Sequence, residues 1–228
     1  MARIIELQNI EKTYTKGVKT KVLYDISLDI QEGSFNSIIG QSGSGKSTLL
    51  NIIGTLDKPT AGKVYINGKR TDLMKKKELA NVRNNMIGFI FQFHYLLPEF
   101  TVLENVLMPF RINKRVKKED ILRAEELIEL VGLTDVKNKK STMISGGQQQ
   151  RCAIARALMN NPKIILADEP TGNLDSVTTE KIYQLLRDIN EKFNTTFLII
   201  THDRKIAEKA DRIIEIKDGK IEMDINRV

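Results

Sequence analysis

The chain has 228 residues, 41% of them hydrophobic and 29% charged, so it can bury a sizeable core and has the composition of an ordinary globular protein. Charges at Arg3 and Glu6 break up the amino-terminal region, and no run approaches the roughly 18 apolar residues of a membrane span, which predicts a soluble, cytoplasmic protein without a secretory signal. The single cysteine, Cys152, excludes an internal disulfide and a cysteine-based metal cluster, and its helical, apolar context predicts a buried thiol.

Much of the net charge of +7 is carried by three basic runs, 75–77, 111–118 and 137–140. Such runs occur on solvated helix faces and also near anionic lipid headgroups, and the sequence leaves both interpretations open. A protein that binds single-stranded nucleic acid usually offers aromatic rings for base stacking. No aromatic residue is interleaved with these runs, so no direct nucleic-acid partner is expected.

In chain order, strand patterns come first, around a glycine-rich loop. They cover 3–10 and 21–30, with a polar turn at 15–17 between them, and a short apolar strand at 34–40 leads into the loop. A helix is predicted over 46–56, followed by strands at 62–67 and 86–91. An Asn-Gly turn signal closes the first of these two strands.

The pattern changes to helices at 102–110, 118–132 and 147–160. Strands at 163–167 and 196–200 then alternate with helices at 176–193 and 203–210, and strands at 212–217 and 220–225 flank an Asp-Gly turn. This order predicts an α/β fold with a mainly parallel sheet, an antiparallel β subdomain and an inserted helical subdomain. We expect a single domain over 1–228, with the core and β subdomain at about 1–92 and 163–228 and the helical subdomain at about 93–162.

A phosphate-binding loop follows the strand at 34–40. The run Gly40-Gln41-Ser42-Gly43-Ser44-Gly45-Lys46-Ser47 matches G-x-x-x-x-G-K-[ST] between a strand and a helix, the context that the pattern requires. The glycines let backbone N–H groups point at phosphate oxygens. Lys46 is expected to contact the β- and γ-phosphates, and Ser47 to bind Mg²⁺. A bare glycine-rich turn would not combine this spacing, chemistry and context.

Two carboxylates, Asp168 and Glu169, follow the apolar strand that ends at 167. The first can hold the Mg²⁺ shell, and the second can orient or deprotonate an attacking water. By themselves they could equally cap a turn. Together with Lys46 and Ser47, they predict ATP hydrolysis.

A second anion-binding run, Ser145-Gly146-Gly147-Gln148, opens the helix predicted at 147–160. Its hydroxyl and its unpaired N–H groups suit a negatively charged ligand. The chain already has one phosphate-binding loop, so this run needs an anion of its own. The γ-phosphate of an ATP held mainly by another copy of the chain meets that need.

Further candidates are ambiguous on the residues alone. His202 and Gln92 each follow a predicted strand, at the end where open α/β sheets bind ligands, and Tyr14 could stack on a base. Each is equally compatible with a packing or structural role. His94 is expected to be a surface or packing residue.

Together these motifs resemble the ATP-binding subunit of ABC transporters, over essentially the whole chain and in the family's order. The resemblance implies a P-loop NTPase (RecA-like) core, with ATP and Mg²⁺ as cofactors. It implies catalytic roles for Lys46, Gln92, Glu169 and His202, and metal binding by Ser47, Gln92 and Asp168. It implies ATP binding by Tyr14, Gly40, Gln41, Ser42, Gly43, Ser44, Gly45, Lys46, Ser47, Thr48, Ser145, Gly146, Gly147, Gln148 and Asp175.

Within the family, the runs 91–101, 103–106 and 168–175 look most like the LolD and MacB-type branch, which serves lipoprotein, peptide or drug export. The resemblance implies a homodimer that sandwiches ATP and powers a separate integral membrane permease subunit, at the inner face of the cytoplasmic membrane. An FtsE-like ATPase that gates a periplasmic activity without transport stays open as an alternative. ABC ATPases of translation or DNA repair usually carry two cassettes or a long coiled coil, and this sequence has neither.

Overall fold

The computed structural model describes residues 2–15, 17–113 and 116–227. Lys16, in the turn predicted at 15–17, and Lys114 and Arg115, in the basic run 111–118, lie outside the described residues. In chain order the elements are β1 (Arg3–Tyr14), β2 (Thr20–Gln31), β3 (Phe35–Ile39), α1 (Lys46–Ile53), β4 (Ala61–Ile66), β5 (Lys69–Arg70), α2 (Lys76–Met86), β6 (Ile87–Phe91), α3 (Val102–Asn113), α4 (Lys118–Leu130), α5 (Gly146–Leu158), β7 (Ile164–Asp168), α6 (Ser176–Phe193), β8 (Thr196–Ile200), α7 (Arg204–Ala207), β9 (Arg212–Lys217) and β10 (Lys220–Asn226).

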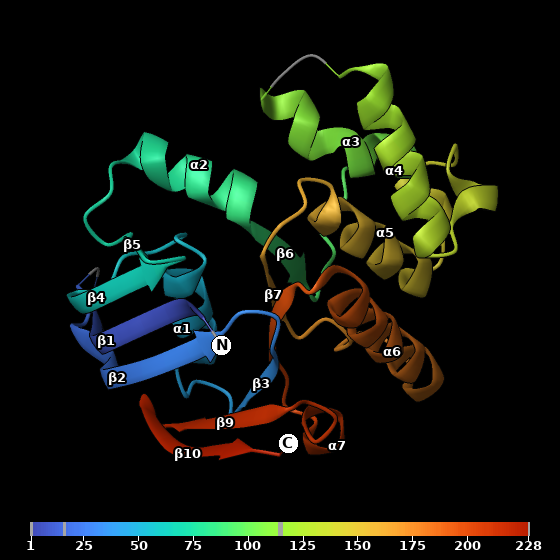
Figure 1. Ribbon diagram of the computed structural model, residues 1–228. Coiled ribbons are helices and arrows are strands. Elements are labelled where there is room, and N and C mark those ends of the chain that lie inside the picture. Colours follow the sequence, from blue (N-terminus) through green and yellow to red (C-terminus); the bar gives the residue numbers. More distant parts are fainter. Residues whose placement is uncertain (1, 16, 114–115, 228) are drawn as a thin grey trace.

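The described strands form two sheets. The central sheet has the order β10-β9-β3-β8-β7-β6 and is parallel except for the β9–β10 hairpin. The second sheet has the order β2-β1-β4-β5 and is antiparallel. In Figure 1 this antiparallel sheet lies on one side of the molecule, and α3, α4 and α5 form a helical group on the other. The predicted combination of a parallel sheet, an antiparallel layer and inserted helices is confirmed.

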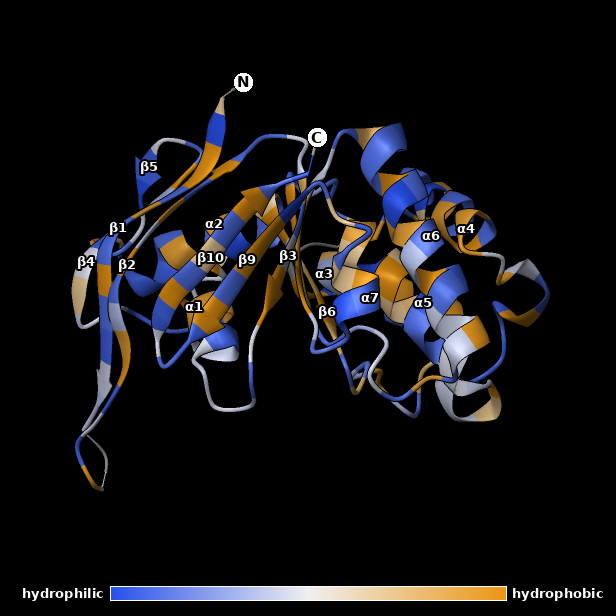
Figure 2. Ribbon diagram, turned by 90° about the horizontal axis from the view of Figure 1, so that it is seen from below, coloured by the Kyte–Doolittle hydropathy of each residue, from blue (hydrophilic) through white to orange (hydrophobic). Residues whose placement is uncertain are grey.

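The central sheet is buried on both faces, because its neighbouring side chains belong to different cores. Phe35 packs with α3, α4, α5 and α6, whereas Ile38 packs with α1 and the antiparallel sheet. The same alternation separates Ile165 from Leu166 on β7 and recurs on β8. Figure 2 shows the apolar character of these central strands. For β3, β7 and β8, packing on both faces leaves the ends of the strands as the places open to a ligand.

The ends of four strands therefore position the polar residues singled out from the sequence. Gly40 follows β3, Gln92 follows β6, Glu169 follows β7, and His202 stands two residues beyond β8. Because β3, β8, β7 and β6 are consecutive, parallel neighbours, these residues share one edge of the sheet.

The main difference from the predicted elements is the segment 69–85, where no element was predicted and the structure has β5 and most of α2; Met86, predicted as the first residue of a strand, ends that helix. The apolar face of α2 is short, with Leu79 buried and Val82 and Met86 partly buried, so the helical signal in its sequence is weak. The predicted helix 46–56 ends early, at Ile53, because Gly54 caps it and Thr55 adopts a left-handed φ of 56°. The predicted helix 203–210 is reduced to the single turn of α7.

The buried cysteine was correctly predicted. Cys152 is 0% exposed, and burial raises the pKa of its thiol to about 12, which keeps it protonated. No helix in the described ranges is long and apolar enough to cross a membrane.

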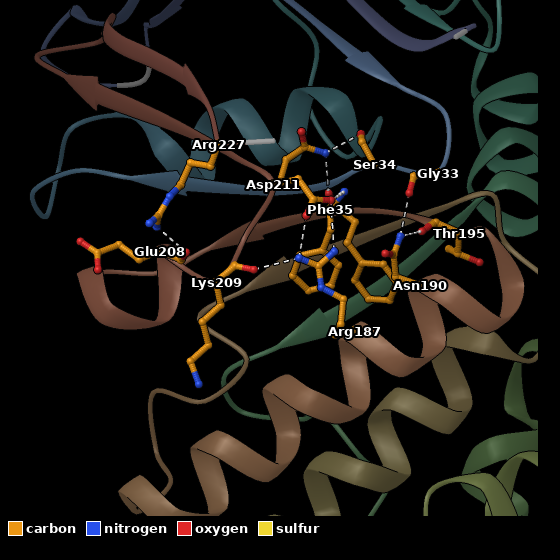
Figure 3. A network of polar contacts seen from close by, with 12 residues as sticks. Gly33, Ser34, Phe35, Arg187, Asn190, Thr195, Glu208, Lys209, Asp211 and Arg227 are labelled. Atoms are coloured by element: carbon orange, nitrogen blue, oxygen red, sulfur yellow. Dashed lines mark hydrogen bonds and ion pairs between the residues drawn. The ribbon is translucent and has the colours of Figure 1, made fainter.

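A partly exposed ion pair between Arg187 and Asp211 connects α6 to the central sheet (Figure 3). The guanidinium of Arg187 donates to both carboxylate oxygens of Asp211, at 2.7 and 3.1 Å, and to the carbonyl of Lys209 at 2.8 Å. It also lies 4.3 Å from the ring centroid of Phe35, whose N–H donates to Asp211. These hydrogen bonds raise the pKa of Arg187. One arginine thus connects α6, β3 and the start of β9.

We expect Arg187→Ala to lower the free energy of unfolding by about 2–3 kcal/mol, because it leaves the Asp211 carboxylate and a backbone carbonyl without their charged donor. Asp211→Ala should cost a similar amount, and the double variant should cost less than the sum by about 1–2 kcal/mol. Chemical denaturation measures all three. Arg204→Ala is the control, since Arg204 lies 3.7 Å from Glu215 with its side chain 69% exposed. Strictly additive losses would contradict the coupling.

Candidate nucleotide-binding site

The loop between β3 and α1 has the geometry of a phosphate cradle. Gly40, Gly43 and Gly45 adopt φ values of 147°, 79° and 102°, which side chains other than glycine rarely allow. A Cβ on Gly40 would lie 2.1 Å from the carbonyl of Ile216. Gly45 precedes α1, and no side chain caps that helix. The first N–H groups of α1 are therefore free to bind an anion.

Lys46 lies at the centre of this loop. Its ammonium donates to the carbonyls of Gly40 at 2.8 Å and Gln41 at 2.7 Å. Burial lowers the pKa of Lys46, and the nearby carboxylates of Glu169 and Asp168 oppose that shift. A largely desolvated ammonium facing an anion cradle is a strong electrostatic contact for phosphate.

Ser47 and Asp168 meet across the cleft between α1 and β7. The hydroxyl of Ser47 donates to a carboxylate oxygen of Asp168 at 3.3 Å. Burial raises the pKa of Asp168, against the opposing effects of Ser47 and Lys46. A partly desolvated carboxylate beside a hydroxyl is the oxygen-rich environment that Mg²⁺ prefers. The described residues contain no cluster of three or more His, Cys, Asp or Glu, so any metal there would take most of its ligands from substrate and water.

Glu169 and His202 form a second pair at the same edge. A carboxylate oxygen of Glu169 lies 2.9 Å from Nδ1 of His202. The side chain of Glu169 is 20% exposed and that of His202 is 72% exposed. Glu169 also has a left-handed φ of 48°, a strained conformation that turns its side chain away from the direction of β7. The pair can orient a water molecule and exchange a proton with it.

Gln92 is held by a residue that the sequence analysis did not single out. Its amide donates to the side-chain oxygen of Asn173 at 3.1 Å, and the amide of Asn173 donates back to the carbonyl of Gln92 at 3.2 Å. Gly172 packs against the same amide: a Cβ on Gly172 would lie 2.8 Å from Nε2 of Gln92. The reciprocal pair joins the loop after β6 to the loop after β7.

One cavity of about 690 Å³, here called the nucleotide pocket, brings most of these residues together. Five hydrophobic side chains in its wall were not candidates from the sequence: Val22, Phe91, Phe93, Tyr95 and Ile200. Gln41 and Ser44 belong to the loop but do not line the cavity. The lining residues that were candidates are Gly40, Ser42, Gly43, Gly45, Lys46, Ser47, Thr48, Gln92, Asp168, Glu169 and His202.

The second predicted anion site lies outside this pocket. Ser145 caps α5: its hydroxyl accepts from the N–H of Gln148 at 3.3 Å, and its own N–H donates to the Gln148 side chain at 2.9 Å. Gly146 and Gly147 begin the helix, and a Cβ on Gly147 would lie 2.8 Å from Thr178 of α6. None of the four residues 145–148 lines the pocket of its own chain.

Asp175 and Tyr14 also lie outside the pocket wall. Asp175 caps α6 by accepting from the N–H of Thr178 at 2.9 Å and from its hydroxyl at 2.6 Å, and these bonds lower the pKa of Asp175. Tyr14, at the end of β1, donates to Asp57 at 3.0 Å and has the ammonium of Lys12 at 4.8 Å from its ring. Its ring is 40% exposed and remains available for stacking.

Comparison with known proteins identifies the family. Residues 23–172 match the family described as ABC transporter. The chain is 49% identical over 228 residues to the lipoprotein-releasing system ATP-binding protein LolD of Aquifex aeolicus (strain VF5), covering 100% of both. It is 48% identical over 224 residues to LolD 1 of Rhodopseudomonas palustris (strain ATCC BAA-98 / CGA009), covering 97% of this chain and 99% of that one.

Solved structures agree with this assignment. The chain is similar to the dimeric MJ0796, a bacterial ABC transporter cassette, with a TM-score of 0.89 and 48% identity over 97% of this chain and 98% of that one. The same values hold for the dimeric post-hydrolysis state of MJ0796 bound to ADP and Pi. For cbiO1 from Clostridium perfringens, part of the ABC transporter complex cbiONQ, the TM-score is 0.89 at 28% identity, over 99% and 89% of the two chains. The chain therefore belongs to the ABC transporter family, as one of its ATP-binding cassettes.

Proposed function

We propose that this chain is the ATP-hydrolysing subunit of a lipoprotein-releasing system of the LolD type. In this proposal two copies close around two ATP molecules and drive a separate integral membrane partner. One observation carries the proposal. The phosphate cradle and the Glu169–His202 pair share one pocket, whereas residues 145–148 form a second anion site that their own pocket does not use.

The phosphates of ATP bind to the free N–H groups at the start of α1 and to Lys46. An incoming phosphate replaces the two carbonyls that the ammonium now contacts, so a flexible side chain is already within reach of the ligand. Ser42, Gly43 and Thr48 complete the contact from the pocket wall. Tyr14 stacks on the adenine from the end of β1, where its exposed face is turned to solvent.

Ser47, Asp168 and Gln92 would hold Mg²⁺. The burial that raises the pKa of Asp168 supports this assignment, because a bound cation offsets the cost of desolvating a carboxylate. When bound, the ion neutralises charge on the phosphates. Gln92 would hold the ion through its side-chain oxygen, since the bond to Asn173 is donated by its amide nitrogen.

Glu169 acts on the attacking water. Its carboxylate accepts a hydrogen bond from the water and can take its proton, and His202 fixes the orientation of that carboxylate through the 2.9 Å contact. The strained backbone at Glu169 keeps the group aimed into the pocket, so little reorganisation is needed when the water attacks.

Ser145, Gly146, Gly147 and Gln148 bind the γ-phosphate held by the other copy. A two-fold axis makes this contact self-complementary, since each chain offers the cradle and receives the second anion site. Asp175 lies beside that site, because Gly147 abuts the first turn of α6, which Asp175 caps. The dimeric state of MJ0796 supports the arrangement, at 48% identity.

The same likeness favours lipoprotein release over an FtsE-like gating role, since the curated relatives reported above are lipoprotein-releasing proteins. A position at the inner face of the cytoplasmic membrane follows from that role. The helical subdomain at about 93–162, with α3, α4 and α5, is then the part of the single domain that faces the membrane partner.

A groove of about 520 Å³ between α2 and α3, here called the α2–α3 groove, is the proposed docking site for a helix of that partner. Most of its wall is apolar, formed by Leu56, Ala80, Ile87, Gly88, Phe89, Phe91, Met108, Pro109, Ile112 and Ala157. Arg83 and Arg156 line it too, and neither forms an ion pair with a carboxylate of the described residues. An amphipathic helix that carries a carboxylate complements this surface.

The ATP sandwich is tested with Glu169→Gln. We expect this variant to bind ATP as the wild type does, to lose turnover by about a thousandfold, and to form a dimer only with ATP, because bound γ-phosphate is no longer removed. Sizing chromatography with and without ATP measures the assembly. A variant that stays monomeric with ATP would show that the sandwich is wrong.

The matched control adds Ser145→Arg to Glu169→Gln. The arginine blocks the second anion site but is remote from the pocket of its own chain. We expect ATP affinity of the monomer within about twofold of the parent and no dimer. Equal loss of ATP affinity and of dimer formation would show that Ser145 does not act on the ATP of the other copy.

For Mg²⁺ we expect Asp168→Asn to abolish the effect of the ion on nucleotide affinity while stabilising the metal-free protein by about 1 kcal/mol. Burial raises the pKa of Asp168, because burying the charged carboxylate destabilises the folded protein. This destabilisation is present above that pKa and disappears as the pH falls and the carboxyl is protonated. The difference in unfolding free energy between variant and wild type should therefore shrink at acidic pH. A difference that grows with acidity would contradict the assignment.

The docking site is tested with Ile112→Lys, which places a cation in a groove that already holds two guanidinium groups. We expect at least about a tenfold loss of membrane subunit co-purified from detergent-solubilised native membranes, with basal ATPase activity unchanged. Leu122→Lys is the control, since Leu122 is 51% exposed on α4 and does not line the groove, whereas Ile112 is 75% exposed. Equal retention or equal loss in the two variants would rule out this site.

A further inference from the structure

The segment from Phe91 to Tyr95 separates the nucleotide pocket from the α2–α3 groove. Phe91 lines both cavities. Gln92, Phe93 and Tyr95 line the nucleotide pocket alone, and Arg156 lines the groove. The backbone between these residues is therefore the wall through which the two cavities can affect each other.

Two successive residues of this wall have an unfavourable backbone. His94 and Tyr95 adopt φ values of 60° and 47°, in the left-handed region that side chains other than glycine seldom occupy. Phe93 is 67% and Tyr95 62% exposed, while His94 is half-buried and the Tyr95 ring packs edge-on against Phe91 with centroids 5.3 Å apart. The local bonds are the N–H of His94 to the carbonyl of Phe91, at 3.2 Å, and that of Tyr95 to the carbonyl of Phe93, at 2.5 Å. Such a conformation persists only where contacts from elsewhere stabilise it.

Arg156, in the last turns of α5, supplies those contacts. Its guanidinium donates to the carbonyl of His94 at 2.6 Å and to that of Tyr95 at 2.7 Å. The planar fork thus spans the two carbonyls that the left-handed residues expose. Burial lowers the pKa of Arg156, and no carboxylate of the described residues is paired with it. Hydrogen bonds to two backbone carbonyls therefore stabilise the partly buried guanidinium of Arg156.

We infer that Arg156 is a positioning residue: it holds residues 93–95 in their strained conformation and thereby sets the place of Gln92 in the nucleotide pocket. The inference rests on the proposed function, in which Gln92 contacts Mg²⁺. Because the same guanidinium lines the groove, a carboxylate on a docked helix can compete with the two carbonyls for it. Arg156 then connects occupancy of the groove to the geometry of the nucleotide pocket.

The test compares Arg156→Gln and Arg156→Lys with Arg83→Gln in the isolated full-length protein. Arg83 is the matched control, because it lines the same groove but donates to the carbonyl of Thr55, at 2.8 Å, and does not touch residues 93–95. The readouts are amide hydrogen exchange of residues 93–97, the Kd for ATP, kcat, and the Mg²⁺ concentration that gives half-maximal activity.

For Arg156→Gln we expect exchange at residues 94 and 95 to rise by about tenfold or more, with global stability high enough for exchange elsewhere to stay at the wild-type rate. We expect kcat to fall by about tenfold and the Mg²⁺ requirement to rise, while the Kd for ATP stays within about twofold. Arg156→Lys should be intermediate, because an ammonium reaches one carbonyl but does not span both. Arg83→Gln should leave amide exchange at residues 94 and 95 at the wild-type rate, because Arg83 bonds to Thr55 and not to this segment.

Wild-type exchange at residues 94 and 95 in Arg156→Gln would overturn the inference. So would increased exchange throughout the protein, which indicates a general packing role, or equal effects in Arg83→Gln. The exchange measurement needs no catalysis. If the wild-type protein hydrolyses no ATP, the proposed function fails, and exchange still decides whether Arg156 holds the segment.

Discussion

The carboxyl edge of the central sheet is the constraint on which the site depends. Four parallel neighbours, β3, β8, β7 and β6, end there; both faces of β3, β8 and β7 are packed, whereas β6 also lines the α2–α3 groove. Their ends must carry the loops, and with them Gly40, Gln92, Glu169 and His202. A shift of one strand by one residue would turn the side chains that face one apolar core toward the other core. It would also displace the polar residue at the end of the strand. Core packing and site geometry are thus specified together.

Three of the non-glycine residues with a left-handed φ, His94, Tyr95 and Glu169, lie at the proposed nucleotide site. Glu169 has a left-handed φ, and its N–H is held at 3.0 Å by the carbonyl of Ile200 at the end of β8. The adjacent strand therefore fixes the backbone of the residue proposed to act on water. The left-handed residues His94 and Tyr95 repeat the pattern beside Gln92, with a side chain from α5 in place of a neighbouring strand. In both places a rigid element stabilises a conformation that the local sequence disfavours.

The sequence was informative where function depends on local pattern. The glycine-rich loop requires positive φ at fixed positions, so the spacing of Gly40, Gly43 and Gly45 is readable without a structure. The α2 helix was missed, because its apolar face has only Leu79, Val82 and Met86 among charged and polar residues.

Contacts between distant segments were also invisible in the sequence. The Gln92–Asn173 pair spans 81 residues, and the contact of Arg156 with His94 spans 62. The sequence shows the runs that hold these residues, but the contacts between them depend on how α5 and the ends of β6 and β7 meet. Resemblance assigned ATP-binding roles to Tyr14 and Asp175, which stay predictions; the contact of Tyr14 with Asp57 and the capping of α6 by Asp175 were not predicted.

The helix α5 connects the second predicted anion site to the segment beside Gln92. Ser145 caps its amino-terminal end, where a partner's γ-phosphate is proposed to bind, and Arg156 near its other end holds the wall beside Gln92. The two residues are eleven positions apart, or about 16 Å along a helix. A helix transmits a displacement over that length with little loss, and α5 packs against β6, the strand that Gln92 follows. Closure around ATP on one copy can therefore move the Gln92 segment of the other, so the two pockets of a dimer need not act independently.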